Sequence, residues 1–238
     1  MTEFDELWPG GPRLARCASF GLGTDSVLLA DFVSAPRAKR IADLGCGCGA
    51  LSVALAARYG SAELTGIEIQ PQFAELCRAS FEANGFSGRC RCICGDLRDR
   101  SLIPAGWADV VVSNPPYFPV RGGHSSPDEA RRIAREELCC TLADVCAAAA
   151  AICRWDGSFF MVHRPERLSE ICCASSAAGL EPKRLRMVQY NHSCAPNLVL
   201  MEFRRGAKPG LDVMPPLVLT DSDGAESAES RRIYHREG

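Results

Sequence analysis

The sequence predicts an α/β fold with a doubly wound, mostly parallel seven-stranded sheet and an antiparallel edge strand. From Ile41 onward, apolar stretches with the pattern of strands alternate with stretches that have the pattern of helices. Most of the strand stretches are continuously apolar, as expected for parallel strands that helices cover on both faces. The last two strand stretches have no helix between them, so we expect them to pair antiparallel at one edge.

Each element has its own signal along the chain. Residues 50–59 are apolar at helical spacing, and Pro71 and Asn84–Gly85 suit the first turn and the end of a second helix. Pro115 and Pro116 end the fourth strand, because proline cannot donate to a central ladder. The expected strands are 40–44, 63–69, 89–94, 108–114, 157–163, 180–190 and 197–205, and the expected helices are 25–33, 50–59, 71–84, 127–153 and 165–178.

The length of 238 residues suits one domain. We expect residues 1–38 to form a segment that precedes the core, 39–205 to form the catalytic core, and 206–238 to be an extended or frayed tail. The tail is rich in Pro, Ser and Glu, and the chain shows no internal repeat.

Composition narrows the class of protein. Hydrophobic residues make up 47% and charged residues 24%, which excludes a disordered, collagenous or coiled-coil chain. No apolar run approaches the roughly 18 residues of a membrane span, and the acidic opening MTEFDELWPGG lacks the apolar core of a signal peptide. We therefore expect a cytoplasmic protein with no membrane partner. The net charge of −2 excludes a general polycation, and the excess of Arg over Lys fits either codon usage or phosphate binding.

Fourteen cysteines do not indicate disulfides in a chain of this size without signs of secretion. Cys90, Cys92 and Cys94 alternate and therefore lie on one face of a strand. No CxxC pair or neighbouring histidine accompanies them, so we predict no metal site.

A glycine cluster follows the first strand directly. Asp43 precedes Gly45, Gly47 and Gly49, and alternating glycines let the backbone turn tightly and approach a ligand. The second strand ends at Glu68, twenty-three residues after Gly45, where a carboxylate can accept from both hydroxyls of a ribose. The absence of GK[ST] argues against a phosphate cradle. A plain strand-to-helix turn is the alternative.

The tetrapeptide Asn114-Pro115-Pro116-Tyr117 follows the fourth strand. An exocyclic aromatic amine is a poor nucleophile, and acceptors for its two N–H groups would localise its lone pair. The Asn114 amide and the Pro115 carbonyl can supply these acceptors on a rigid backbone. Tyr117 offers a ring on which a flipped base can stack. The alternative is a turn, for which Asn and Pro are also suited.

These residues resemble the class I S-adenosylmethionine-dependent methyltransferases, with their Rossmann-like fold. The resemblance implies S-adenosyl-L-methionine as cofactor, with Asp43 and the three glycines near its methionine part and Glu68 on its ribose. It also implies that Asp96 lies at the adenine, although an aspartate after a strand is a common turn former. Asn114-Pro115-Pro116-Tyr117 resembles the signature of enzymes that methylate adenine N6, cytosine N4 or a glutamine amide.

Residues 14–205 resemble more narrowly the bacterial adenine-N6 methyltransferases that modify the anticodon loop of a valine tRNA. The start Gly23-Thr24-Asp25, followed by Leu28-Leu29, carries this resemblance together with the two motifs above. It implies that Thr24 and Asp25 close over the cofactor, in the segment 1–38. An N-cap for the helix that follows is compatible with that role.

The expected function is methyl transfer to adenine N6 in RNA, with tRNA preferred among RNAs. The alternatives are a glutamine-amide methyltransferase acting on a release factor, a DNA methyltransferase, and a catalytically silent cofactor-binding subunit. About forty residues before Ile41 are too few for the extra domain usual in release-factor enzymes, and an intact Asn114 argues against a silent subunit. The sequence favours no oligomeric state. Two groups of basic residues fit either phosphate contacts or structural ion pairs. The first is Arg121, Arg131, Arg132 and Arg135, and the second is Arg164, Arg167, Lys183, Arg184 and Arg186.

Overall fold

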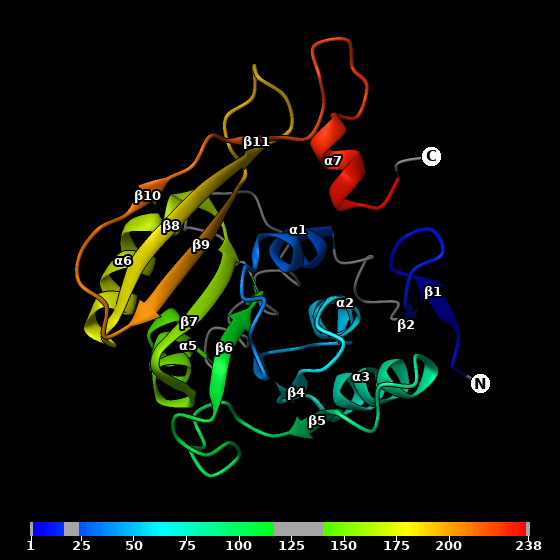
Figure 1. Ribbon diagram of the computed structural model, residues 1–238, viewed down its shortest axis with the longest axis vertical. Coiled ribbons are helices and arrows are strands. Elements are labelled where there is room, and N and C mark those ends of the chain that lie inside the picture. Colours follow the sequence, from blue (N-terminus) through cyan, green and yellow to red (C-terminus); the bar gives the residue numbers. More distant parts are fainter. Residues whose placement is uncertain (1, 17–23, 117–139, 237–238) are drawn as a thin grey trace, which may run out of the picture.

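A computed structural model describes residues 2–16, 24–116 and 140–236. Its main sheet has the strand order β10-β8-β9-β7-β6-β3-β4-β5, and β11 also pairs with β8 (Figure 1). All seven predicted strands are present in this sheet, so the predicted fold class is confirmed. The short strands β10 and β11 were not predicted, and with them the sheet has nine strands among the described residues. The strands are β3 (Arg40–Leu44), β4 (Glu63–Glu68), β5 (Cys90–Cys94), β6 (Ala108–Ser113), β7 (Cys153–His163), β8 (Leu180–Gln189), β9 (Leu198–Arg205), β10 (Asp212–Val213) and β11 (Leu217–Val218).

Strand directions follow the predicted pattern. β3 is parallel to β4 and β6, β5 is parallel to β4, and β7 is parallel to β6. β9 is antiparallel to both β7 and β8. The carboxyl ends of β3 to β7 therefore meet at one edge of the sheet, where ligands bind in folds of this kind.

Helices cover both faces of the sheet (Figure 1). Val110 and Val112 pack with apolar residues of α1 (Thr24–Phe32), α2 (Ala50–Arg58) and α3 (Pro71–Ala83) on one face. Val111 packs with α5 (Leu142–Ile152) and α6 (Leu168–Ala177) on the other, and a short 3-10 helix (Pro165–Arg167) precedes α6. This alternation along β6 is why the strand is apolar throughout.

The predicted helix 127–153 is confirmed over Leu142–Ile152, but it starts later than predicted within the described residues. Residues 127–139 lie outside the described residues, and α5 begins only at Leu142. Thr141 has an extended backbone, and its side chain accepts from the Asp144 N–H while the Asp144 carboxylate accepts from the Thr141 N–H. This capping box places the helix start at Leu142, inside the predicted range.

The C-terminal tail is not frayed. Beyond the extended strands β10 and β11 it forms α7 (Ala228–Ile233), which Figure 1 shows beside α1. Arg232 forms an ion pair with Asp31 of α1. His235 stacks on Trp8 with ring centroids 4.3 Å apart. These contacts anchor the tail, and composition could not reveal them.

Residues near the N-terminus form a hairpin of β1 (Phe4–Glu6) and β2 (Arg13–Ala15). The Ala15 N–H donates to the Ser80 hydroxyl of α3 at 2.9 Å, and the Asn84 side chain bonds the backbone of Arg13 in both directions. The hairpin is thereby joined to the outer side of α3. No helix in the described ranges is long and apolar enough to cross a membrane.

Candidate active site

The glycine loop after β3 has a backbone that favours glycine. Gly45, Gly47 and Gly49 have φ angles of 72°, 54° and 93°, in the left-handed region. The N–H groups of Gly45 and Cys46 both donate to the Ile67 carbonyl of β4, at 2.9 and 3.0 Å. These bonds attach the loop to the neighbouring strand end and leave Gly45 exposed at the ligand edge.

Glu68 stands at the end of β4 beside this loop. Its carboxylate accepts from the N–H of Gly47 and from the N–H of Gln70, each at 2.9 Å. Burial raises the pKa of Glu68, and the backbone hydrogen bonds from Gln70 and Gly47 oppose that rise. A carboxylate has about four acceptor sites, so it can accept two further hydrogen bonds from vicinal hydroxyls.

Asp43 lies deeper, within the end of β3. It is only 1% exposed, and its Oδ2 accepts from the Ser52 hydroxyl of α2 at 2.6 Å. Burial raises the pKa of Asp43 to about 7, against the effect of the Ser52 hydrogen bond. Its other oxygen, Oδ1, is buried without a hydrogen-bond partner among the described residues. An orphaned buried acceptor of this kind suits a donor group on a ligand.

Asp96 follows β5 and is partly exposed, whereas Asp43 and Glu68 are buried. Arg98 donates to both oxygens of the Asp96 carboxylate, and this hydrogen bonding lowers the pKa of Asp96. The carboxylate therefore stays charged but is shared with Arg98. Any adenine amine bound there must share it too.

Asn114 directly follows β6, and its amide is held from α1. Its Nδ2 donates to the Ser26 hydroxyl at 3.0 Å, and Ser26 is itself buried. This bond orients the amide, and Oδ1 is the acceptor atom of that side chain. Pro115 is buried and Pro116 exposed. Tyr117 lies outside the described residues.

The start of α1 thus belongs to the same edge. The Thr24 hydroxyl donates to the Asp25 carboxylate at 3.4 Å, and Ser26 follows directly. The prediction named Thr24 and Asp25 but missed Ser26. Its place in the same tripeptide was the only signal that could have drawn attention to it.

The sequence of this chain is similar to those of known proteins. The family model of the methyltransferase small domain matches residues 21–165, which include the glycine loop, Glu68 and Asn114. The chain belongs to this family. A protein of Porphyromonas gingivalis named tRNA1(Val) (adenine(37)-N6)-methyltransferase is 31% identical over 222 residues, covering 89% of this chain and 86% of its own. A protein of the same name from Tolumonas auensis is 30% identical, covering 90% of this chain and 87% of its own.

Solved structures are similar in fold. A predicted O-methyltransferase from Agrobacterium tumefaciens superposes with a TM-score of 0.74 at 24% identity, covering 88% of this chain and 95% of that one. A geranyl diphosphate methyltransferase in complex with sinefungin gives a TM-score of 0.54 at 15% identity, covering 76% and 78%. The predictions of a methyltransferase and of S-adenosylmethionine as its cofactor are confirmed.

The arginines around β7 and β8 of this methyltransferase form structural ion pairs. Arg184 pairs with Glu202 of β9, and Arg186 donates to both oxygens of Glu229 on α7, at 2.8 Å each. Arg167 pairs with Glu170 at 2.5 Å. For these three arginines the structural interpretation holds. Arg121, Arg131, Arg132 and Arg135 lie outside the described residues.

His163, at the end of β7, is a buried strand-end histidine. It is 1% exposed, and its Nδ1 accepts from the Arg164 N–H at 2.7 Å. Burial lowers the pKa of His163 to about 4, and the charge of Arg167 lowers it further. The imidazole is therefore neutral near pH 7.

Proposed function

We propose that this methyltransferase transfers a methyl group to the exocyclic N6 amine of an adenine in tRNA, at the position named for its relatives. One observation carries the proposal: Asn114 follows β6 at the same sheet edge as the glycine loop and Glu68, with its amide oriented by Ser26. An amide acceptor beside a cofactor loop is what methylation of a weakly nucleophilic amine requires.

Cofactor contacts follow from the same edge. Glu68 would accept from the ribose hydroxyls, and Asp43 with the loop of Gly45, Gly47 and Gly49 would lie near the methionine part. Asp96 would face the adenine, sharing its carboxylate with Arg98. The start of α1, with Thr24 and Asp25, would cover the bound cofactor. S-adenosylmethionine would supply a methyl group on a sulfonium, and the neutral thioether S-adenosylhomocysteine would depart as the leaving group.

The catalytic residues act on the amine. In the proposed complex, Asn114 Oδ1 and the Pro115 carbonyl each accept one N–H of the adenine amine. The nitrogen lone pair then turns away from the ring and toward the methyl group, and the acceptors stabilise the growing positive charge on nitrogen. Tyr117 would stack on the extruded base. No side chain with a strong base is needed, because the proton becomes acidic once the nitrogen is alkylated.

The names of relatives that match most of this chain support tRNA as the substrate class. The two named above cover about nine-tenths of this chain, so the likeness includes the sequence beyond the catalytic core. A tRNA substrate also supports a cytoplasmic enzyme, because the relatives named above are bacterial proteins and bacterial tRNA is made and used in the cytoplasm.

To test this proposal, the protein is incubated with labelled S-adenosylmethionine and, in separate reactions, with total tRNA, ribosomal RNA, DNA or a release factor. Nucleoside mass spectrometry of the labelled product should find N6-methyladenosine from tRNA alone. Labelled release factor would establish the glutamine-amide alternative, labelled DNA the DNA alternative, and cofactor binding without transfer in every arm the silent-subunit alternative.

Ser26→Ala should lower kcat while leaving cofactor affinity unchanged. Loss of the Ser26 hydroxyl removes the acceptor that the Asn114 Nδ2–H group bonds, at a cost of about 1 kcal/mol, or roughly fivefold in kcat. Ser175→Ala, which removes a buried hydroxyl on the far face of the sheet, is the matched control. Steady-state kinetics on tRNA would measure both variants, and an equal loss in the two would contradict a positioning role for Ser26.

A surface aromatic that sequence reasoning missed also lies at the active edge. β8 runs in the same direction as β7, because both are antiparallel to β9. Tyr190 follows β8 directly and is 59% exposed. An exposed ring at this edge suits stacking on an unpaired base of the substrate.

Tyr190→Ala should weaken tRNA binding by about 1–3 kcal/mol, the usual value of one stacked base. Tyr190→Phe should keep the affinity, because it keeps the ring. Trp155→Ala removes another exposed aromatic, 70% accessible, from the start of β7 at the opposite edge and should have no effect. Filter binding would report the dissociation constants, and equal losses for Tyr190→Ala and Trp155→Ala would exclude a specific contact.

A further inference from the structure

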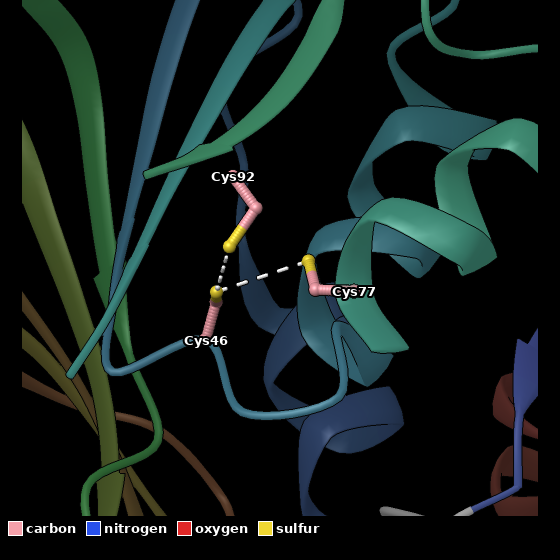
Figure 2. Close-up of side chains that lie close together, drawn as sticks. All are labelled: Cys46, Cys77 and Cys92. Carbon is pink, nitrogen blue, oxygen red and sulfur yellow. Dashed lines mark hydrogen bonds between the residues drawn. The ribbon is translucent and has the colours of Figure 1, made fainter. Parts of the chain in front are cut away.

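Three cysteine side chains from three different elements converge beside the cofactor loop (Figure 2). Cys46 lies in the glycine loop, Cys77 in α3 and Cys92 in β5. The Cys46 sulfur is 3.8 Å from that of Cys77 and 3.5 Å from that of Cys92, and all three sulfurs lie within 4.8 Å of one another. All three residues are buried, at 7%, 0% and 6% exposure.

Neighbouring glycines make room for these sulfurs. A Cβ on Gly66 would approach the Cys46 sulfur to 2.7 Å, and a Cβ on Gly49 would approach the Cys77 sulfur to 2.9 Å. Within the described ranges, this is the one group of three metal-ligating side chains. These three thiols therefore form a defined cluster, unlike cysteines that are merely buried one by one as small apolar side chains.

The dimensions of the triangle suit a metal ion. In the plane of the three sulfurs, the point equidistant from them lies at most about 2.4 Å from each, and a zinc–thiolate bond is about 2.3 Å. Thiolates select soft ions. Arg78 donates to the Cys92 carbonyl at 3.0 Å, which brings a positive charge close to the ligand set.

We propose that Cys46, Cys77 and Cys92 bind one soft, thiophilic metal ion, with Cu(I) as the best match. Zinc in structural sites takes four ligands, and among the described residues no fourth His, Asp or Glu joins this cluster. Cu(I) accepts three sulfurs, keeps its oxidation state on binding, and displaces the thiol protons to solvent. The spacing of 31 and 15 residues matches no metal motif, so the sequence-based prediction of no metal site did not weigh this set.

The ion would link the cofactor loop to α3 and β5. Cys46 stands between Gly45 and Gly47, and the Gly47 N–H is bonded to Glu68. Since the sulfurs already converge, binding requires little movement of the backbone. The expected result is a more stable fold, because an ion that binds only the native state raises Tm.

The test is an anaerobic titration of the reduced full-length protein with Cu(I) in competition with a chromophoric Cu(I) chelator. The parent should retain one equivalent, and a hundredfold excess over Kd should raise Tm by about 5–10 °C. Cys92→Ser should weaken retention by at least about tenfold. Cys153→Ala removes a buried thiol outside the cluster and should retain the ion like the parent.

X-ray absorption on the loaded parent protein checks the site without any substitution. A shell of three sulfurs and no nitrogen or oxygen supports the proposal. Three results would overturn it: a mixed shell, retention that Cys92→Ser and Cys153→Ala lower equally, or displacement of Cu(I) by Zn(II) in stoichiometric competition.

Discussion

Asn114→Ala should fold, bind S-adenosylmethionine almost normally, and lose about 10²–10³ in kcat. Its amide oxygen is expected to act in the transition state, when the amine nitrogen gains positive charge and its N–H groups become better donors. In the ground state the same contact is worth little, so the loss should fall on kcat rather than on KM. Single-turnover methylation of tRNA, read by nucleoside mass spectrometry, would measure the change.

Asn114→Asp is the matched control for this variant. A carboxylate at the same position keeps acceptor oxygens, and the Ser26 hydroxyl can donate to one of them in place of accepting from Nδ2. Asn114→Asp should therefore retain more activity than Asn114→Ala. The proposed mechanism fails if Asn114→Ala makes N6-methyladenosine within a few-fold of the parent rate.

Local pattern was sufficient to predict strands β3 to β9 of the sheet. Val110, Val111 and Val112 are apolar in succession because helices pack on both faces of β6, and the same burial explains the other central strands. The predicted start of α5 failed because an Ala-rich helical pattern reveals little about where a helix begins. A capping side chain decided that boundary, and Thr141 with Asp144 was overlooked within a run that favoured helix throughout.

The candidate site could be predicted from the sequence where its residues directly follow parallel strands. Glu68 and Asn114 follow parallel strands, and parallel strands bring their carboxyl ends together whatever the loops between them contain. Ser26 and Tyr190 were not predictable in this way. Their roles depend on how α1 and the antiparallel strand β8 are placed against that edge, and such placement comes from tertiary packing.

The other contacts that the sequence did not predict join residues from distant segments of the chain. Cys46, Cys77 and Cys92 come from a loop, a helix and a strand, so no local spacing relates them. Arg232 meets Asp31 across two hundred residues of sequence, and this contact orders a tail whose composition suggested fraying. A sequence pattern reports on neighbours along the chain, whereas these contacts depend on the completed fold.

Glu68→Ala should raise the dissociation constant for S-adenosylmethionine by about 10–150-fold. Each hydrogen bond to a charged group is worth about 1.5–3 kcal/mol, and the carboxylate is expected to accept from the ribose. The substitution also removes the acceptor that holds the Gly47 and Gln70 N–H groups, at 2.9 Å each, so the glycine loop loses part of its support. Calorimetric titration of the cofactor would measure the effect.

The pH dependence of cofactor affinity distinguishes a role of the Glu68 charge from a role of the size of its side chain. Burial raises the pKa of Glu68, so protonation begins at a higher pH than for an ordinary glutamate, and it removes acceptor capacity. Cofactor affinity of the parent should therefore weaken as pH falls through this raised pKa, and Glu68→Ala should lack that dependence. Glu68→Gln places an amide donor toward one of the two backbone N–H donors, so it too should bind weakly and without this pH dependence. Unchanged affinity in Glu68→Ala would remove Glu68 from the ribose contact, since both the loop and the hydroxyls would then be held by other groups.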